Sequence, residues 1–227
     1  MVSFVMPPIT LTRPAAVVFD MDGLLLDSER VALELFAQAA AELNLPWEHK
    51  VGLRMIGLNS WESDKRVLHA FGADYPIAML RKRFGNLYEE LIDRGGISTR
   101  PFAHELLQAL KENQIPCAVA TSTQRTRAEL KLMRSGLLSY FQALACGDEV
   151  VRSKPAPDIF LLAAERLGRQ PEQCLVLEDS NAGVRGAVAA GMSVVMVPDL
   201  LEPDPEVIQM GVPCVESLKD MLDCFQS

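Results

Sequence analysis

Residues 20–29 read Asp-Met-Asp-Gly-Leu-Leu-Leu-Asp-Ser-Glu and follow directly on a short apolar run at residues 15–19. The length of that run and its β-branched valines are typical of a buried strand. Asp20 and Asp22 therefore bring two carboxylates to the carboxyl end of a predicted sheet, where open α/β folds bind ligands. Gly23 lets the backbone turn there. Taken alone, the stretch also fits an ordinary acidic turn.

The same ten residues resemble the nucleophile motif of the haloacid dehalogenase superfamily, in its phosphotransferase branch. Three further stretches resemble the other motifs of that family, in the family's order: Thr121 after a second apolar run, Lys154 within residues 152–158, and Glu178-Asp179 after a third apolar run. Four ordered matches across nearly the whole chain are far more specific than any one of them. The resemblance implies a hydrolase of this superfamily, in the phosphatase or β-phosphoglucomutase-like branch with a helical cap.

Composition excludes several classes of protein. The chain is 49% hydrophobic, but its apolar runs are too often interrupted to form a membrane span. Its net charge of −8 and the absence of a dense Lys/Arg cluster argue against nucleic-acid binding. The five cysteines are scattered and form no Cys-x-x-Cys pair, so we expect a reduced, cytoplasmic protein. Residues 1–14 lack a basic start before an apolar run and are predicted to be a loose leader, not a secretory signal. We expect a monomer with no membrane or nucleic-acid partner.

The predicted fold is α/β, a Rossmann-like parallel sheet covered by helices on both faces, with an inserted all-helical domain. Between residues 30 and 96 no strand-like alternation occurs, and the helical patterns there lie at 31–43, 60–71 and 77–92. The family resemblance implies that this insert is a cap. The predicted limits are 1–29 and 98–227 for the core and 30–97 for the cap. A helical hairpin that merely covers the sheet is the alternative.

From residue 101 onward, predicted strands and helices alternate. The strands are predicted at 115–120, 144–147, 174–177 and 193–197, and the helices at 103–113, 127–135, 157–167, 182–190 and 217–224. Residues 198–206 are predicted to form an acidic, proline-containing loop. Strands that alternate with helices imply parallel crossover units.

The resemblance implies catalytic roles for four side chains. Asp20 would form an aspartyl-phosphate, and Asp22 would protonate the leaving group and later activate water. Thr121 would hydrogen-bond a phosphoryl oxygen, with the backbone N–H of Ser122 beside it, and Lys154 would neutralise both nucleophile and phosphate. The structural alternatives are an Asx-turn for Asp22, a helix N-cap for Thr121 and a solvated loop for Lys154.

A Mg²⁺ site is implied as well. Asp179 would bind the ion with Asp20 and the backbone carbonyl of Asp22, while Glu178 would act directly or through water. Mg²⁺ favours carboxylates and retained waters over a complete protein cage. Several acidic groups converging on a phosphate dianion repel one another strongly, so a divalent cation is expected. An acidic turn that opens a helix explains one of these carboxylates but not both beside the others.

Residues of the cap are predicted to determine substrate specificity, because the core is expected to contact mainly the phosphoryl group. Asn59 and Trp61 stand in a turn-like segment between two cap helices. Asn59 could hydrogen-bond hydroxyl groups and Trp61 could stack on a sugar face. Burial of Trp61 between cap helices is the alternative.

These observations predict a Mg²⁺-dependent phosphomonoester hydrolase that acts on a small phosphorylated metabolite such as a sugar phosphate or phosphoglycolate. A sugar-phosphate mutase of the β-phosphoglucomutase type is the first alternative. By resemblance, Ala32 stands where that mutase has a gating histidine, and residues 59–61 carry no cation where it has an arginine. A catalytically silent binding domain is the second alternative, and the intact Asp20, Asp22, Lys154 and Asp179 argue against it. A dehalogenase is disfavoured, since that branch makes no use of the second aspartate.

Overall fold

The computed structural model describes residues 13–56 and 60–226, and these divide into two compact units. One unit contains residues up to Leu26 and from Thr99 onward, and the other is Asp27–Ser98. The predicted limits of the inserted domain were residues 30 and 97. Each unit has a hydrophobic core of its own.

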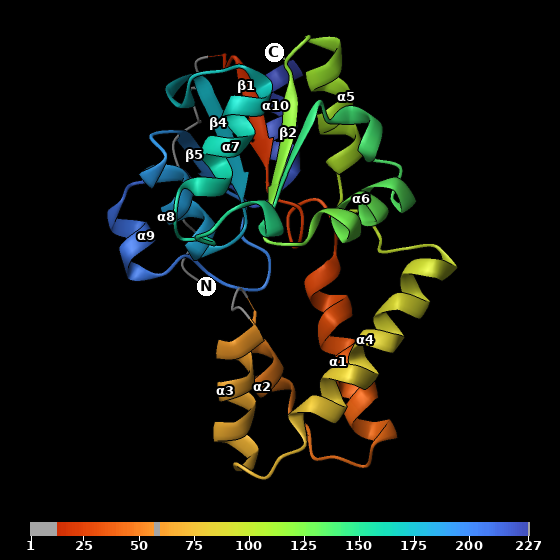
Figure 1. Cartoon of the computed structure of the whole chain (residues 1–227). Coiled ribbons are helices and arrows are strands. Elements are labelled where there is room, and N and C mark those ends of the chain that lie inside the picture. Colours follow the sequence, from red (N-terminus) through yellow and green to blue (C-terminus); the bar gives the residue numbers. More distant parts are fainter. Residues whose placement is uncertain (1–12, 57–59, 227) are drawn as a thin grey trace. The chain divides into compact units, whose positions relative to one another are not determined.

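The larger unit is built on a five-stranded parallel sheet in the order β3-β2-β1-β4-β5 (Figure 1). The strands are β1 (Ala16–Phe19), β2 (Cys117–Thr121), β3 (Ala143–Cys146), β4 (Cys174–Glu178) and β5 (Ser193–Met196). Val18 of β1 pairs with Ala118 on one side and Val176 on the other. Every residue of the three central strands is buried, which explains why they read as continuous apolar runs. The predicted fold class is confirmed.

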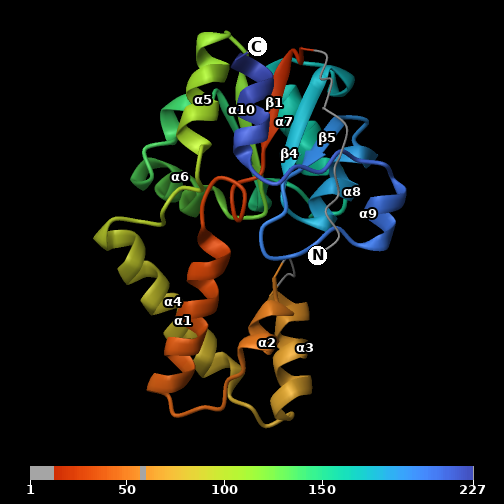
Figure 2. The same ribbon diagram turned by 180° about the vertical axis from the view of Figure 1, so that it is seen from behind.

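Helices cover both faces of this sheet. They are α5 (Ala103–Glu112), α6 (Arg125–Arg134), α7 (Asp158–Leu167), α8 (Asn181–Ala189), α9 (Pro205–Gln209) and α10 (Leu218–Gln226), with short 3₁₀ turns at Leu138–Tyr140, Gly147–Glu149 and Pro171–Gln173. On one face, Phe160 of α7 and Val184 of α8 pack in a core with Val18 and Val176 of the sheet. Helices α5 and α10 pack together on the opposite face (Figures 1 and 2).

The smaller unit is entirely helical. It consists of α1 (Ser28–Glu42), α2 (His49–Leu53), α3 (Ser60–Phe71) and α4 (Ile77–Arg94). Phe36 of α1 lies at the centre of its core, and its ring stacks on Phe84 of α4 with centroids 3.9 Å apart and on Trp47 at 5.6 Å. Aromatic stacking of this kind adds to the burial of apolar area, so these helices stabilise one another.

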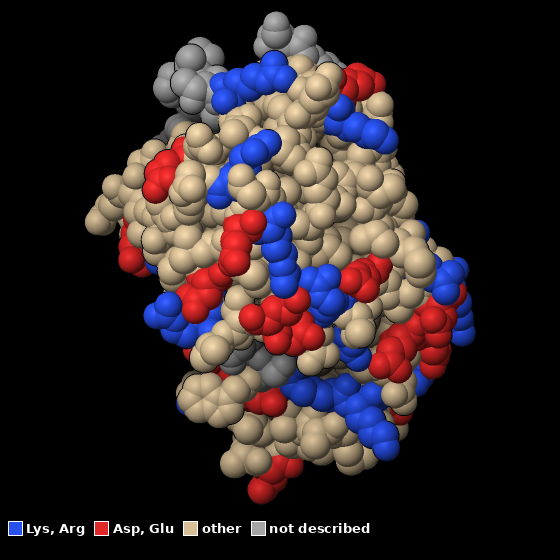
Figure 3. All heavy atoms as spheres, turned by 45° about the horizontal axis from the view of Figure 1, so that its top comes forward, with Lys and Arg blue, Asp and Glu red and all other residues tan. Residues whose placement is uncertain are grey.

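Two observations on the described residues concern the prediction that the protein has no nucleic-acid or membrane partner. On the face shown in Figure 3, basic side chains are mixed with acidic ones. A stripe of one sign, which is the footprint of nucleic-acid binding, is not seen on that face. Among residues 13–56 and 60–226, no helix has the length and apolar character needed to cross a membrane.

Candidate active site

The predicted core residues come from the carboxyl ends of the three central strands. Asp20 follows β1 directly, Thr121 is the last residue of β2, and Glu178 is the last residue of β4 with Asp179 behind it. All four residues are buried. Strand order reverses at β1, because the chain runs outward through β2 on one side and β4 on the other. Ligands bind at this reversal point in parallel α/β sheets.

Lys154 links the ends of these strands. Its ammonium donates hydrogen bonds to Asp20 Oδ1, to Glu178 Oε1 at 2.6 Å and to the backbone oxygen of Ala120 at 3.0 Å. The Lys154 side chain is only 7% exposed. An ammonium buried to this degree is tolerated because carboxylates and a carbonyl replace its water. The loop at 152–158 therefore supplies a buried cation beside Asp20.

Burial and charge act against each other at this ion cluster. Burial raises the pKa of Asp20 to about 7, while the charge of Lys154 opposes the rise and that of Glu178 adds to it. For Lys154, burial lowers the pKa, but Asp20 and Glu178 outweigh it and the net pKa lies above the ordinary value. Lys154 is therefore protonated at neutral pH. Further positive charge beside Asp20 would favour its ionised form.

Both carboxylate oxygens of Glu178 are hydrogen-bonded. Oε1 accepts from Lys154, and Oε2 accepts from the backbone N–H and the hydroxyl of Ser180, each at 2.9 Å. Ser180 is also the N-cap of α8, since its Oγ accepts from the N–H of Gly183 at 3.0 Å. Glu178 thus fixes the position of Lys154 and ties it to the start of α8.

Gly183 leaves room for the Glu178 carboxylate. A Cβ atom at position 183 would overlap the Oε1 and Cδ atoms of Glu178. The group that this glycine accommodates is therefore a side chain of the ion cluster. The backbone of α8 can begin this close to Glu178 only because position 183 has no side chain.

We expect Gly183→Ala to displace Glu178 and to reduce thermal stability and turnover together. Disturbing a buried, hydrogen-bonded charge costs about 3 kcal/mol. Gly85→Ala in α4 is the matched control, because nothing lies within 4 Å of a Cβ there. Replacing a helical glycine by alanine in open space stabilises by about 0.5–1 kcal/mol. A Gly183→Ala variant as stable and active as the Gly85→Ala variant would contradict this account.

Asp22 is held by two residues that the sequence analysis did not select. Lys131 Nζ donates to Asp22 Oδ1 and Thr123 Oγ1 donates to Asp22 Oδ2, both at 2.7 Å. Lys131 is buried on α6, next to the buried Leu132. A signal was present in the sequence, because Lys131 falls on the helix face that carries the apolar residues. The sequence alone does not show that this face of α6 packs against the rest of the unit, so the burial of Lys131 could not be inferred from it.

Thr121 ends β2, and Ser122 begins the turn that follows it. The hydroxyl of Thr121 accepts a hydrogen bond from the N–H of Thr123 at 3.1 Å. Ser122 is exposed, and its backbone carbonyl lies so close to Gly147 that a Cβ at position 147 would overlap it. The structure therefore places both predicted phosphate-binding residues at the same end of the sheet as Asp20.

The geometry agrees with the outcome of comparisons with known proteins. The family model of haloacid dehalogenase-like hydrolases matches residues 14–191 of the chain. The chain belongs to this family. The matched residues include the ends of β1, β2 and β4 and the loop that carries Lys154.

Relatives of this hydrolase include proteins named as phosphatases of particular metabolites. The fructose-1-phosphate phosphatase YqaB of Escherichia coli K12 is 34% identical over 188 residues, 82% of this chain and 97% of that protein. A probable pseudouridine-5′-phosphatase of Drosophila melanogaster is 41% identical over 194 residues, 80% of each chain. The structure of CbbY from Rhodobacter sphaeroides with phosphate matches with a TM-score of 0.74 at 28% identity, over 94% of this chain and 100% of that one. The predicted superfamily branch and the enzyme class, a phosphoric monoester hydrolase, are confirmed.

The donors in the core of this hydrolase suit a hard cation. Among the described residues, no group of three or more His, Cys, Asp or Glu side chains is arranged to hold a metal ion. Mg²⁺ does not require such a group, since it binds through one or two carboxylates and keeps several waters. Asp20 and Asp179 follow adjacent strands and offer these carboxylates. Glu178 suits the role less well, because both its oxygens already accept hydrogen bonds.

The two predicted cap residues have different outcomes. Asn59 lies outside the described residues. Trp61, in the first turn of α3, is 66% exposed, and Lys65 Nζ lies 3.2 Å from the centroid of its ring. Trp61 is therefore not buried among the helices of its unit, and the alternative of a core tryptophan is wrong. Its contact with substrate stays a prediction.

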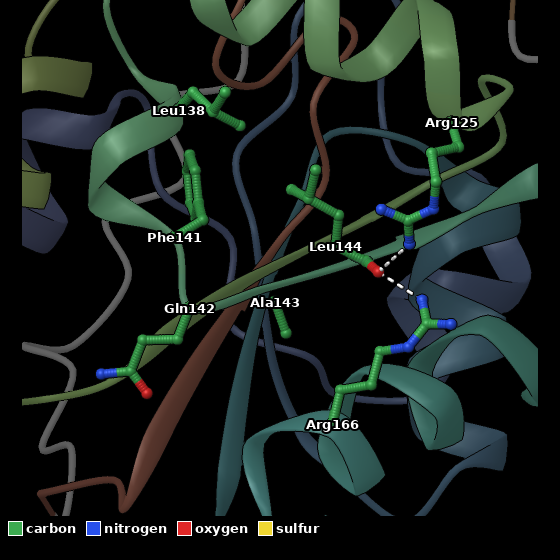
Figure 4. Close-up of a pocket in the computed structure, with 7 residues that line it drawn as sticks. All are labelled: Arg125, Leu138, Phe141, Gln142, Ala143, Leu144 and Arg166. Atoms are coloured by element: carbon green, nitrogen blue, oxygen red, sulfur yellow. Dashed lines mark hydrogen bonds between the residues drawn. The ribbon is translucent and has the colours of Figure 1, made fainter.

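A separate cavity of 470 Å³ lies along the edge strand β3 and is shown in Figure 4. Arg125 and Arg166 point toward one another across it, and both donate hydrogen bonds to the backbone oxygen of Leu144. Both guanidinium groups also bind Glu149, and their hydrogen bonds lower the pKa of Glu149 to about 2. Arg125 also pairs with Glu129 at 2.9 Å, so two carboxylates balance the two guanidinium charges. The arginines thus satisfy a carbonyl of the edge strand, and we read this cavity as the covered edge of the sheet.

Proposed function

We propose that this hydrolase removes the phosphoryl group from a small phosphorylated metabolite, with Asp20 as the nucleophile. The observation that carries the proposal is the buried ion cluster of Asp20, Lys154 and Glu178 at the reversal point of the sheet. A cation held beside the attacking carboxylate reduces its repulsion from a phosphate dianion. Similarity to phosphatases of fructose 1-phosphate and pseudouridine 5′-phosphate supports a substrate of this size.

The proposed reaction has two steps. In the first, a carboxylate oxygen of Asp20 bonds to phosphorus while the ester P–O bond breaks, and Asp22 gives its proton to the leaving oxygen. In the second, a water oxygen bonds to phosphorus, its proton passes to Asp22, and the bond between Asp20 and phosphorus breaks. Lys154 and the Thr121 hydroxyl stabilise charge on the phosphoryl oxygens in both steps.

We further propose that Asp20, Asp179 and the backbone carbonyl of Asp22 hold Mg²⁺. When bound, Mg²⁺ offsets the charge of the carboxylates and of the phosphoryl group. In this arrangement Glu178 acts by positioning Lys154. The contacts of Asn59 and Trp61 with substrate, a monomeric state and a cytoplasmic location stay predictions, the last in keeping with five free cysteines.

The net reaction is expected to be hydrolysis. A mutase must protect its phosphoenzyme from water until the bisphosphorylated intermediate has turned around. The resemblance assigns the mutase's gating histidine to position 32, which is an alanine in α1 here. Alanine cannot donate a hydrogen bond, so this control over Asp22 is missing.

We expect one phosphate released per monophosphate consumed, with no dependence on a bisphosphate primer. The measurement is a panel of sugar phosphates, nucleotide monophosphates and phosphoglycolate, assayed for free phosphate with Mg²⁺ present, with the Asp20→Asn variant as the blank. Conversion of β-glucose 1-phosphate into glucose 6-phosphate with little free phosphate would establish the mutase alternative instead.

A further inference from the structure

The Asp22 carboxylate is fixed at two points. Lys131 Nζ donates to Oδ1 and Thr123 Oγ1 donates to Oδ2, each at 2.7 Å. Because each oxygen has its own donor, rotation of the carboxylate would break at least one of these bonds. The hydrogen bonds from Lys131 and Thr123 therefore hold the Asp22 carboxylate in one orientation.

Stability alone does not account for a lysine at position 131. The Lys131 side chain is 7% exposed, whereas Arg127 and Arg134 on the same helix are exposed. Burying an ammonium costs several kcal/mol, and well-packed apolar residues in place of a buried ion pair are often neutral or stabilising. Lys131 also follows the buried Ala128 by one helical turn, so an apolar residue would suit this face of α6.

Lys131 and Thr123 suit the stage of the reaction at which Asp22 is ionised. A protonated carboxyl group carries a hydrogen on one oxygen and accepts poorly there, whereas a carboxylate accepts on both oxygens. Lys131 and Thr123 therefore complement Asp22 after it has given its proton to the leaving group. At that stage its remaining task is to take a proton from the water that attacks the phosphorylated Asp20.

We propose that Lys131 is a positioning residue which, with Thr123, orients Asp22 as the base for hydrolysis of the aspartyl-phosphate. The proposal rests on the function proposed above and adds to it the assignment of Lys131 and Thr123 to the second step. In that step the water oxygen bonds to phosphorus, Asp22 takes the proton, and the electron pair of the broken bond returns to Asp20. The role assigned to Lys131 is exerted through its hydrogen bond to Asp22 and not through contact with the reacting atoms.

The test compares formation and breakdown of the phosphoenzyme in Lys131→Met. Rapid quench with a ³²P-labelled monophosphate measures both rates in one experiment. We expect breakdown to slow about 10–100-fold, part of the 10²–10⁴-fold that a positioned base contributes. Formation should change less than breakdown, so phosphoenzyme accumulates and a burst precedes the steady state. Turnover should then become equal for substrates with good and poor leaving groups, because breakdown is common to all of them.

Matched variants separate positioning from loss of structure. Lys131→Arg keeps the charge and should restore a large part of the breakdown rate. Thr123→Val should produce the same accumulation, and its effect should be less than additive with Lys131→Met because both act through Asp22. Arg134→Met on the exposed face of α6 and Thr126→Val should behave as the wild type.

Equal slowing of formation and breakdown in both Lys131→Met and Thr123→Val, with no accumulated phosphoenzyme, would overturn the proposal. If Lys131→Met does not fold, Thr123→Val and Lys131→Arg decide by the same readout. Absence of phosphoenzyme in the wild type, together with an active Asp20→Asn variant, would instead count against the proposed function itself.

Discussion

Asp20→Asn is expected to lower turnover by about 10⁴-fold or more, the scale of losing a nucleophile. The amide has the volume of the carboxylate, and its oxygen can still accept the hydrogen bond from Lys154, but it does not attack phosphorus. The variant should not lose stability, because burial already disfavours the Asp20 charge and raises its pKa to about 7. Steady-state phosphate release and thermal unfolding, measured on one preparation, check both expectations.

Asp93→Asn is the control for this substitution. Asp93 is an exposed residue near the end of α4, so removing its charge should change neither turnover nor thermal stability. A folded Asp20→Asn protein that turns over at a rate near that of the wild type would show that the nucleophile lies elsewhere.

Removal of divalent cations with EDTA is expected to abolish phosphate release, and added Mg²⁺ should restore it. Asp20, Glu178 and Asp179 bring three carboxylates to the edge of the sheet where the phosphoryl group is proposed to bind, and Lys154 forms ion pairs with Asp20 and Glu178. Without further positive charge, the repulsion opposes substrate binding and the approach of the nucleophile.

Asp179→Ala should lower the rate and raise the Mg²⁺ concentration needed for half-maximal activity. A readout independent of catalysis is the increase in melting temperature on adding Mg²⁺, which follows from binding to the folded state alone. The wild type should show this increase, and Asp179→Ala should show a smaller one. Full activity of Asp179→Ala at low Mg²⁺ would mean that the metal site does not include this residue.

Much of the larger unit could be predicted because its strands are buried on both faces. Residues 115–120 and 174–177 read as uninterrupted apolar runs, and the strands found there end at Thr121 and Glu178. Since parallel strands end at one edge of the sheet, polar residues directly after them meet in space. The grouping of Asp20, Thr121 and Asp179 at that edge follows from this rule.

Short helices were harder to predict. Helix α9 lies partly within the predicted acidic loop, although Asp204 caps it by accepting from the N–H of Val207 at 3.0 Å and Pro205 stands at its first position. Both signals are in the sequence, but five residues are too few to show helical periodicity. Helix α2 (His49–Leu53) was missed for the same reason.

Contacts between side chains far apart in sequence could not be predicted. Lys131 and Asp22 are 109 positions apart, and only the packing of α6 brings them within hydrogen-bond distance. The overlap that a side chain at Gly183 would cause depends on the rotamer of Glu178, which no periodicity encodes. That both oxygens of Glu178 accept hydrogen bonds, from Lys154 and from Ser180, was likewise not predictable, and its metal role, directly or through water, stays a prediction.

The most direct test of the account is a crystal structure of the wild-type protein grown with Mg²⁺ and beryllium fluoride or aluminium fluoride, which mimic a transferred phosphoryl group. We predict the fluoride group on a carboxylate oxygen of Asp20, with Lys154 and the Thr121 hydroxyl on its fluorine atoms and Mg²⁺ bound by Asp20 and Asp179. Fluoride density at another residue, or a fluoride group in place while Asp20 stays bound only to Lys154, would contradict the assignment of Asp20 as the nucleophile.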